Sequence, residues 1–179
     1  LPLLVKQLLL QRGFTGGMET ELFLDPRLSH LSDPFLMGEM RAAVDRIFRA
    51  VDEGETVCIY GDYDVDGVTS VALLRAILMA YDLDPQYFIP VRSREGYGLS
   101  EAGIKRCLCE CADPPSLLIT VDCGTSSVKE VDMLNSLGID VIILDHHEAG
   151  PLGRPDAAAV VNAKIEENSP YTCLLYTSD

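Results

Sequence analysis

The feature that most constrains the fold is an alternation, after residue 55, of short apolar runs and longer helical stretches. The apolar runs are rich in Val, Ile and Leu and too short for buried helices, so they predict strands. The predicted strands are 56–60, 86–90, 116–121, 140–144 and 157–161, and the helices between the first four are 68–81, 100–111 and 126–136. Such strands joined through helices predict an α/β fold, a parallel sheet with helices on both faces.

The first 54 residues carry no strand pattern and are predicted to form a helical N-terminal segment. Within it, DPFLMGEMRAAVDRIFRAV predicts a helix with Asp33 as N-cap and Pro34 at the first helical position. Its apolar face is expected to serve core packing. The face consists of Met37, Met40, Val44, Ile47, Phe48 and Val51.

Polar side chains follow four of the predicted strands, at the point where each strand ends. They are Asp62, Asp64 and Asp66, then Asp122, then Asp145, His146 and His147, and finally Asn162. In a parallel α/β sheet the ligand lies beyond these carboxyl ends. Carboxylates gathered without cations raise one another's pKa, so a cluster of this kind is usually held by metal. Carboxylate and imidazole ligands suit Mn²⁺, Mg²⁺ or Fe²⁺, and a bridging aspartate would hold two ions for phosphoester hydrolysis.

The run GDYDVDG has two other interpretations. Counting Asp62 as position 1, the spacing of Asp64, Asp66 and Gly67 matches a calcium-binding EF-hand loop, but position 12 is Leu73 instead of Glu and a strand precedes the loop. The pair Asp66-Gly67 is also a hairpin signal, but the following VTSVALLRAILMAY has helical spacing. A lone aspartate at a strand end is most often a cap or turn former, and that role stays open for Asp62.

Composition limits the classes of ligand. The 179 residues include 14 Lys and Arg against 28 Asp and Glu, a formal net charge of −14. Such a chain has no general attraction for nucleic acid, so a polyanionic substrate would need metal ions or a local basic patch. Phosphate loops of the GxGxxG or GxxxxGK kind are missing from the sequence, which removes the usual nucleotide-binding folds.

The cysteines and the first residues of the chain indicate the cellular compartment. Six cysteines, at positions 58, 107, 109, 111, 123 and 173, form no CxxC pair, so a zinc knuckle is not predicted. Free thiols and a cytoplasmic location are expected. The opening LPLLVKQLLLQRGF is too short and too interrupted for a membrane span and has no signal-peptide cleavage site, so no membrane partner is expected. The missing initiator Met suggests a fragment.

Three motifs carry a family resemblance. GDYDVDGVTS, TVDCGTSS and LDHHE occur in the order of motifs I, II and III of the DHH phosphoesterase superfamily and resemble them. FLDPRLSHLSDPFLMGEM, IPVRSREGYGLS and VVNAK are further similar to RecJ-type exonucleases, over roughly residues 10–173. The resemblance implies an enzyme with two ions, Mn²⁺ or Mg²⁺, that hydrolyses single-stranded DNA from its 5′ end in repair and recombination. It also implies a single-strand-binding protein and a helicase as partners.

The resemblance assigns metal ligands by position. Asp64 and Asp66 resemble the motif I ligands, and Asp122 resembles the bridging ligand of motif II. His146 resembles a ligand of motif III, and Asp62 is a further metal candidate.

It also assigns residues for the substrate. Asp145 is expected to orient His146, and His147 to contact the scissile phosphate. In RSREGYGLS, Arg92 and Tyr97 are expected to offer a guanidinium group to a phosphate and a ring to a base.

The chain departs from the family pattern in two places. Many members have a histidine four residues before the first ligand, where this chain has Tyr60. RecJ-type chains continue after a segment like SPYTCL into a motif IV aspartate and a DNA-gripping domain, whereas this chain ends LYTSD. The expected organisation is a helical segment (1–54), a truncated DHH catalytic domain (55–174) and a tail (175–179) that fits no element and suggests foreign sequence.

Two alternative functions stay open. The first is a DHH phosphodiesterase acting on cyclic dinucleotides or short oligonucleotides, against which EGYGLS and the helical first segment count. The second is a non-catalytic replication scaffold, which would be expected to have lost the metal ligands that motifs I to III retain here.

Overall fold

The computed structural model describes residues 1–166, which form two compact units divided after Asp33. The smaller unit holds α1 (Leu3–Gln11), α2 (Met18–Leu24) and a 3₁₀ turn (Leu28–His30). Within it the rings of Phe14 and Phe23 stack 4.4 Å apart. The predicted helical character of this stretch is confirmed. The segment SPYTCL, Cys173 and the tail 175–179 lie outside the described residues.

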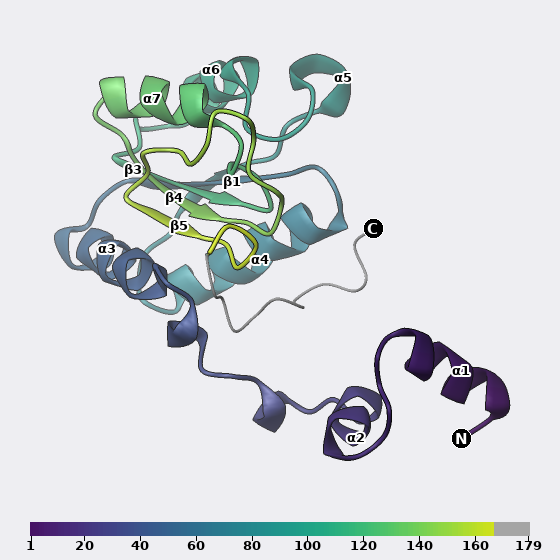
Figure 1. Cartoon of the computed structure of the whole chain (residues 1–179). Helices are drawn as coiled ribbons and strands as arrows, with labels where there is room; N and C mark the ends of the chain where they lie inside the picture. The colour runs from purple at the N-terminus through teal and green to yellow at the C-terminus, as the bar shows by residue number, and fades with distance from the viewer. Residues whose placement is uncertain (167–179) are drawn as a thin grey trace. The chain divides into compact units, whose positions relative to one another are not determined.

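The larger unit is built on a parallel sheet with the strand order β2-β1-β3-β4-β5 (Figure 1). The strands are β1 (Val57–Gly61), β2 (Gln86–Phe88), β3 (Leu117–Val121), β4 (Asp140–Leu144) and β5 (Ala159–Val161). Ile59, Ile119 and Ile142 are in register across the three central strands. The strands β1 and β3 are buried along their whole length, as near-continuous apolar runs predict. The predicted α/β fold is therefore confirmed.

Helices cover both faces of this sheet (Figure 1). One face carries α6 (Glu101–Glu110) and α7 (Val128–Ser136), and the other carries α3 (Met40–Glu53) and α4 (Val65–Met79), with the short α5 (Arg92–Glu95) before α6. Alternate side chains of β1 enter two separate cores: Cys58 and Tyr60 pack under α6 and α7, while Val57 and Ile59 pack under α3 and α4. Residues after a strand end can therefore face either layer.

Helix α3 begins at Met40, later than the predicted start at Pro34, so the prediction of Asp33 as its N-cap is wrong. The residues from Pro34 form a 3₁₀ turn that ends before Gly38. The N–H of Gly38 donates to Oε1 of Glu166 at 3.0 Å, and glycine is a poor helix former. The α-helical hydrogen bonds therefore begin only after Gly38, and α3 starts at Met40.

Most of the predicted apolar face of α3 packs on the sheet. Its members in the core are Met37, Met40, Ile47 and Val51. Phe48 is instead exposed, with its ring edge-on to Tyr81 at 5.3 Å. Because α3 packs against β5, the larger unit starts at Pro34, well before the expected boundary between residues 54 and 55. No helix within residues 1–166 is long and apolar enough to cross a membrane.

Candidate metal centre

The turn from β1 into α4 fixes Asp64. This residue is the N-cap of α4, and its Oδ1 accepts the backbone N–H groups of Asp66 at 2.9 Å and Gly67 at 3.1 Å. These hydrogen bonds, that of Gly67 first, lower the pKa of Asp64. A Cβ atom at position 67 would overlap the backbone of Asp62, so only glycine lets the first turn of α4 approach β1 this closely. Asp64 is thereby held ionised at the sheet edge.

Asp62 is fully buried at the end of β1. Its Oδ1 accepts the N–H of Tyr63 at 2.7 Å, while its Oδ2 has no hydrogen-bond partner among residues 1–166. Burial raises the pKa of Asp62. An unpartnered buried carboxylate oxygen is costly, which suits a cation there. The capping role left open for Asp62 belongs to Asp64 instead.

Asp122 follows β3 and lies between the motif I loop and the histidines. Its φ of 61° places it in the left-handed region, which is uncommon for a residue other than glycine. Its Oδ1 lies 2.8 Å from Nε2 of His146, and its Oδ2 is buried without a partner in the described part of the chain. Burial, followed by the neighbouring carboxylate of Asp64, raises the pKa of Asp122 to about 6. The two carboxylates therefore repel each other at the place where a cation would neutralise both.

Two groups of possible ligand atoms meet at Asp122. In each group the atoms lie within 4.8 Å of one another; the groups are Asp62, Asp64 and Asp122, and Asp122, Asp145, His146 and His147. Ligand atoms about 2.1–2.6 Å from a cation lie at most about 5 Å apart, so each group fits one ion. Among residues 1–166, the ion pairs of these aspartates involve only the two histidines. The donor set fits divalent cations of the Mg²⁺ and Mn²⁺ kind.

Asp145 contacts the ring of His147 but only the backbone of His146. Its Oδ1 lies 2.7 Å from Nδ1 of His147, and its two oxygens accept the backbone N–H groups of His146 at 2.7 Å and Thr125 at 2.9 Å. The expectation that Asp145 orients the ring of His146 is wrong, because that ring contacts Asp122. Burial would raise the pKa of Asp145, but these donors outweigh it and hold the pKa below its ordinary value.

Asn162, at the end of β5, links the loop that carries His147 to the loop that carries Thr125. It is fully buried, and its Nδ2 donates to Oγ1 of Thr125 and to the carbonyl oxygen of His147, both at 2.8 Å. The sequence marks Asn162 only as a polar residue after an apolar strand. Its position directly after VV is the one signal of this role, because a buried amide must find partners.

Aromatic side chains border the histidine pair. The hydroxyl of Tyr97 lies 3.1 Å from Nε2 of His147, and its ring lies 6.2 Å from that of Tyr63. The guanidinium carbon of Arg92 lies 5.4 Å from the centre of the Tyr63 ring. Arg92 and Tyr97 thus flank the ligand groups. Sequence reasoning missed Tyr63, although it stands inside GDYDVDG between two candidate ligands.

Tyr60, which replaces a histidine of the family pattern, points away from the ligand groups. It is buried in the core under α6 and α7, and its hydroxyl donates to the carbonyl of Gly98 at 3.1 Å. Its role here is to fix the segment that carries Tyr97.

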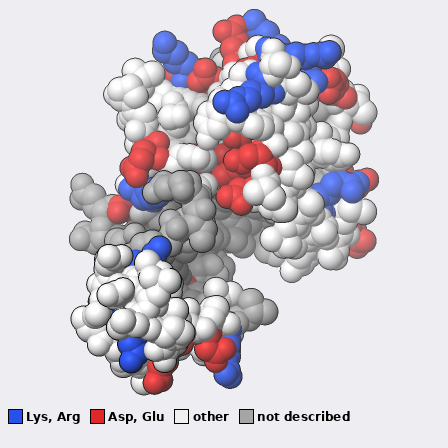
Figure 2. All heavy atoms as spheres, turned by 90° about the vertical axis from the view of Figure 1, so that its right-hand side faces the viewer, with Lys and Arg blue, Asp and Glu red and all other residues white. Residues whose placement is uncertain are grey.

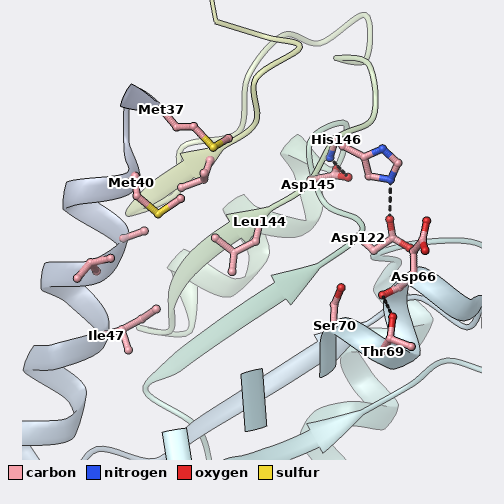
Figure 3. A pocket seen from close by; sticks show the side chains of 13 residues that line it. Met37, Met40, Ile47, Asp66, Thr69, Ser70, Asp122, Leu144, Asp145 and His146 are labelled. Atoms are coloured by element: carbon pink, nitrogen blue, oxygen red, sulfur yellow. Dashed lines mark hydrogen bonds and ion pairs between the residues drawn. The ribbon is translucent and has the colours of Figure 1, made fainter. Parts of the chain in front are cut away.

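A cavity of about 460 Å³ opens beside Asp122 and His146 (Figure 3). Its polar wall includes Asp66 and Asp145, and its apolar wall comes largely from α3, including Met40. Asp66 belongs to neither ligand group, and its exposed side chain lines this cavity. Its role as a ligand stays a prediction. The face seen in Figure 2 carries a compact acidic patch near its centre, with Lys and Arg side chains mainly above it.

The model of the DHH family, N-terminal domain, matches residues 56–178. The chain belongs to the DHH family. Of the residues in its three motifs, Asp64, Asp122, Asp145, His146 and His147 lie in the two ligand groups, whereas Asp66 does not.

This DHH-family chain is similar to curated exonucleases. It is 43% identical over 161 residues to the single-stranded-DNA-specific exonuclease RecJ of Bacillus subtilis (strain 168), covering 90% of this chain and 20% of the relative. It is 33% identical over 170 residues to RecJ of Escherichia coli (strain K12), covering 93% and 28%. The chain thus spans between a fifth and a third of the length of these relatives.

Two solved structures resemble the fold. The crystal structure of exonuclease RecJ bound to manganese matches with a TM-score of 0.68 and 31% identity, over 77% of this chain and 34% of that one. The crystal structure of RecJ in complex with Mn²⁺ from Thermus thermophilus matches with a TM-score of 0.65 and 29% identity, over 90% and 21%.

Proposed function

We propose that this protein hydrolyses phosphodiester bonds of single-stranded DNA from the 5′ end, using two divalent cations, Mn²⁺ or Mg²⁺. The observation that carries the proposal is Asp122, a buried carboxylate shared by two ligand groups whose aspartates pair with no arginine or lysine among the described residues. The relatives named as single-stranded-DNA-specific exonucleases and the manganese-bound neighbours support it.

The ions are assigned to the two groups around Asp122. Asp62 and Asp64 would hold one ion and His146 the other, and Asp122 belongs to both groups. Asp66, which lines the neighbouring cavity, is proposed as a further ligand. When bound, such ions lower the pKa of a coordinated water and stabilise charge on the attacking and leaving oxygens. The protein fixes the ligands beforehand, since Asp64 is held by a helix N-terminus and His146 by Asp122.

His147 and Tyr97 are proposed to act on the substrate. Asp145 anchors Nδ1 of His147, which leaves Nε2 facing the hydroxyl of Tyr97, at the edge of the ligand groups. A phosphate oxygen bound there would receive a hydrogen bond from either group. The exposed ring of Tyr97 offers a surface for a base, and Arg92 offers charge to the next phosphate.

The finer setting is also proposed: cytoplasmic DNA repair and recombination, with a single-strand-binding protein and a helicase as partners. The catalytic residues fall within the expected domain 55–174, after the helical segment 1–54. The substrate named for the relatives supports this setting.

The test compares substrates with the intact protein in Mn²⁺. Single-stranded DNA labelled at the 5′ end, the same strand labelled at the 3′ end, its duplex, and a cyclic dinucleotide are incubated in parallel. We expect mononucleotide release first from the 5′ label, and little release from the duplex. Faster turnover of the cyclic dinucleotide would instead identify a small-molecule phosphodiesterase. Binding of single strands without turnover in any divalent ion would identify a scaffold.

A further inference from the structure

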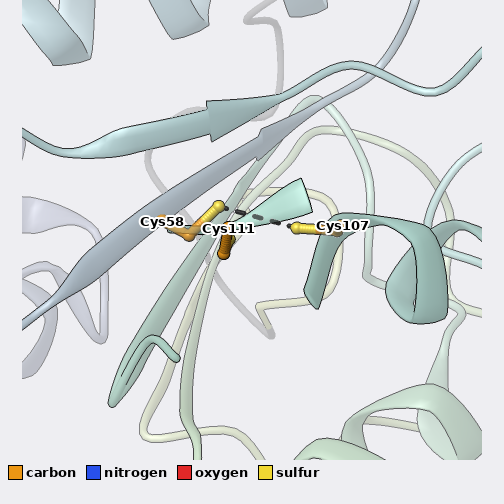
Figure 4. A group of neighbouring side chains, drawn as sticks. All are labelled: Cys58, Cys107 and Cys111. Atoms are coloured by element: carbon orange, nitrogen blue, oxygen red, sulfur yellow. Dashed lines mark hydrogen bonds between the residues drawn. The ribbon is translucent and has the colours of Figure 1, made fainter. Parts of the chain in front are cut away.

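Three cysteines converge on the face of the sheet that carries α6 (Figure 4). Cys58 comes from β1, Cys107 from the last turn of α6, and Cys111 from the position that follows this helix. Their sulfur atoms all lie within 4.8 Å of one another, and the sulfurs of Cys58 and Cys107 are 3.6 Å apart. All three are free thiols.

These separations match a thiolate metal site. Sulfurs about 2.3 Å from a tetrahedral zinc ion lie about 3.8 Å from one another. The observed spacing reaches that value with small side-chain movements. Cys123 provides an internal comparison: it is buried in the same core as Cys58 and Cys107, yet no second thiol groups with it among the described residues. Convergence is therefore a property of these three positions and not of buried cysteine in general.

The site is open to ions from outside. Cys107 and Cys111 line a cavity of about 350 Å³ whose wall includes the carboxylates of Asp84 and Glu110. Cys111 is partly exposed, so an ion in this cavity could reach the three sulfur atoms. Three protein thiolates leave one position of a tetrahedral ion for water. Both carboxylates are paired with arginines, at 2.8 and 3.2 Å, so the preference for a cation rests on the thiols.

The thiol group is distinct from the DHH centre. Cys58 is the second residue of β1 and points toward α6, whereas Asp62 follows the carboxyl end of the same strand. Cys107 and Cys111 are four residues apart, which places them on one side of α6, where β1 packs. The ligands therefore come from two elements far apart in sequence, a spacing that a search for CxxC pairs does not detect.

We propose that Cys58, Cys107 and Cys111 bind one zinc ion that ties the end of α6 to β1. Binding converts the thiols to thiolates and releases their protons to solvent, with no change in oxidation state. The ion replaces contacts between neutral thiols by a link between a helix and the central strand, so it stabilises the fold without entering the reaction.

Cobalt titration tests the proposal. Co²⁺ takes the place of zinc, and its thiolate charge-transfer absorption in the near ultraviolet arises from sulfur ligands alone. The full chain, reduced with a phosphine, is titrated with Co²⁺ and then with Zn²⁺. We expect a band that saturates at the intensity of one thiolate-bound cobalt ion per chain and disappears on addition of Zn²⁺. Carboxylate and imidazole ligands give no such band, so the result is independent of the proposed hydrolysis.

The matched variants are Cys111→Ser and Cys109→Ser. Cys109 is an exposed cysteine on the same helix outside the sulfur group. Losing a direct ligand should weaken binding by more than about tenfold, since even indirect partners of a ligand cost that much. Cys109→Ser should bind as the parent does. Equal bands in both variants would refute the role of Cys111, and absence of the band in the parent would refute the site.

If Cys111→Ser fails to fold, the rate of cysteine alkylation in the parent chain tests the same site. Zinc should slow alkylation of Cys111 in the parent chain by at least about tenfold, as expected for a coordinated thiolate, and leave Cys109 unchanged. Equal slowing at both cysteines, or a Cys58–Cys107 disulfide in place of protection, would overturn the proposal.

Discussion

Two clusters of carboxylates lie at opposite ends of the same parallel sheet, and they differ in what neutralises them. At the amino ends, Arg46 is buried between Glu55, which it contacts at 2.8 and 3.0 Å, and Asp140, which it contacts at 2.6 Å. Arg49 adds a contact to Asp140 at 3.1 Å. Every carboxylate in this cluster has a cation supplied by α3.

At the carboxyl ends the described residues supply no arginine or lysine to the aspartates. One carboxylate of each cluster shows the difference in its pKa. The hydrogen bond from Arg46 lowers the pKa of Glu55, whereas burial and the neighbouring carboxylate of Asp64 raise the pKa of Asp122. A cluster that is internally neutralised stabilises the fold, and a cluster left short of positive charge retains a cost that a bound cation removes.

The largest expected effect comes from Asp122→Asn. The amide keeps the size of the side chain but cannot bridge two cations, so Mn²⁺-dependent digestion of single-stranded DNA should fall by at least about 10³-fold. The rate is measured on 5′-labelled DNA with the intact protein. The control is Asp113→Asn, an exposed aspartate away from both clusters, which should digest at the parental rate. Parental activity in Asp122→Asn would remove Asp122 from the site.

The next effect should appear at the other cluster. Arg46→Met leaves Glu55 and Asp140 without their buried partner, which should lower the free energy of unfolding by about 3–5 kcal/mol. Urea unfolding measures the loss, and the hydrolysis rate per folded molecule should not change. Arg49→Met is the control, because Arg49 is half exposed and its loss should cost under about 1 kcal/mol. Similar losses in both variants would show that the buried pair is not special.

A third prediction uses pH in the presence of a chelator. The folded pKa of Asp122, about 6, lies above its unfolded value of about 3.9, so the stability this group contributes is complete below pH 4 and is lost as pH rises to 6. Two pKa units correspond to about 3 kcal/mol as an upper bound. Glu55 has the opposite sign: its folded pKa is lowered, so its contribution is present above about pH 4.3 and is lost on acidification.

The measurement is urea unfolding of the parent and of Asp122→Asn between pH 4 and pH 6.5. The difference between them should change by about 2–3 kcal/mol across this window, and Mn²⁺ should remove the loss in the parent. A difference that stays constant with pH would mean that Asp122 ionises normally in the fold.

The smallest effect is expected from Tyr97→Phe. The change deletes the hydroxyl next to Nε2 of His147 and keeps the ring, so kcat should fall about two- to tenfold, the value of one hydrogen bond, with KM little changed. Tyr87→Phe, an exposed tyrosine of β2, serves as the control. A larger rise in KM than fall in kcat would place Tyr97 in DNA binding alone.

The sequence predicts the sheet well because its strands are buried on both faces. The runs that became β1 and β3 are buried at every position and almost wholly apolar, which favours central strands of a covered parallel sheet. The rule that ligands lie beyond the strand ends also brings Asp62, Asp122 and Asp145 to one edge. Both results follow from the direction of the strands, which can be predicted from the order of strands and helices along the sequence.

The sequence pattern does not predict which side chains contact one another. Whether Asp145 meets His146 or His147 depends on torsion angles within one loop, and the structure selects His147. The start of α3 depends on a contact between Gly38 and Glu166, which are far apart in sequence.

The close approach at Gly67 has a consequence for how this protein can vary. Any side chain at this position would push α4 away from the backbone of Asp62 and move Asp64 with it. In a survey of all single substitutions, position 67 should therefore be as intolerant as the aspartates around it. Gly67 would then look like a catalytic residue in such a survey, although it contributes only the space that lets α4 approach Asp62.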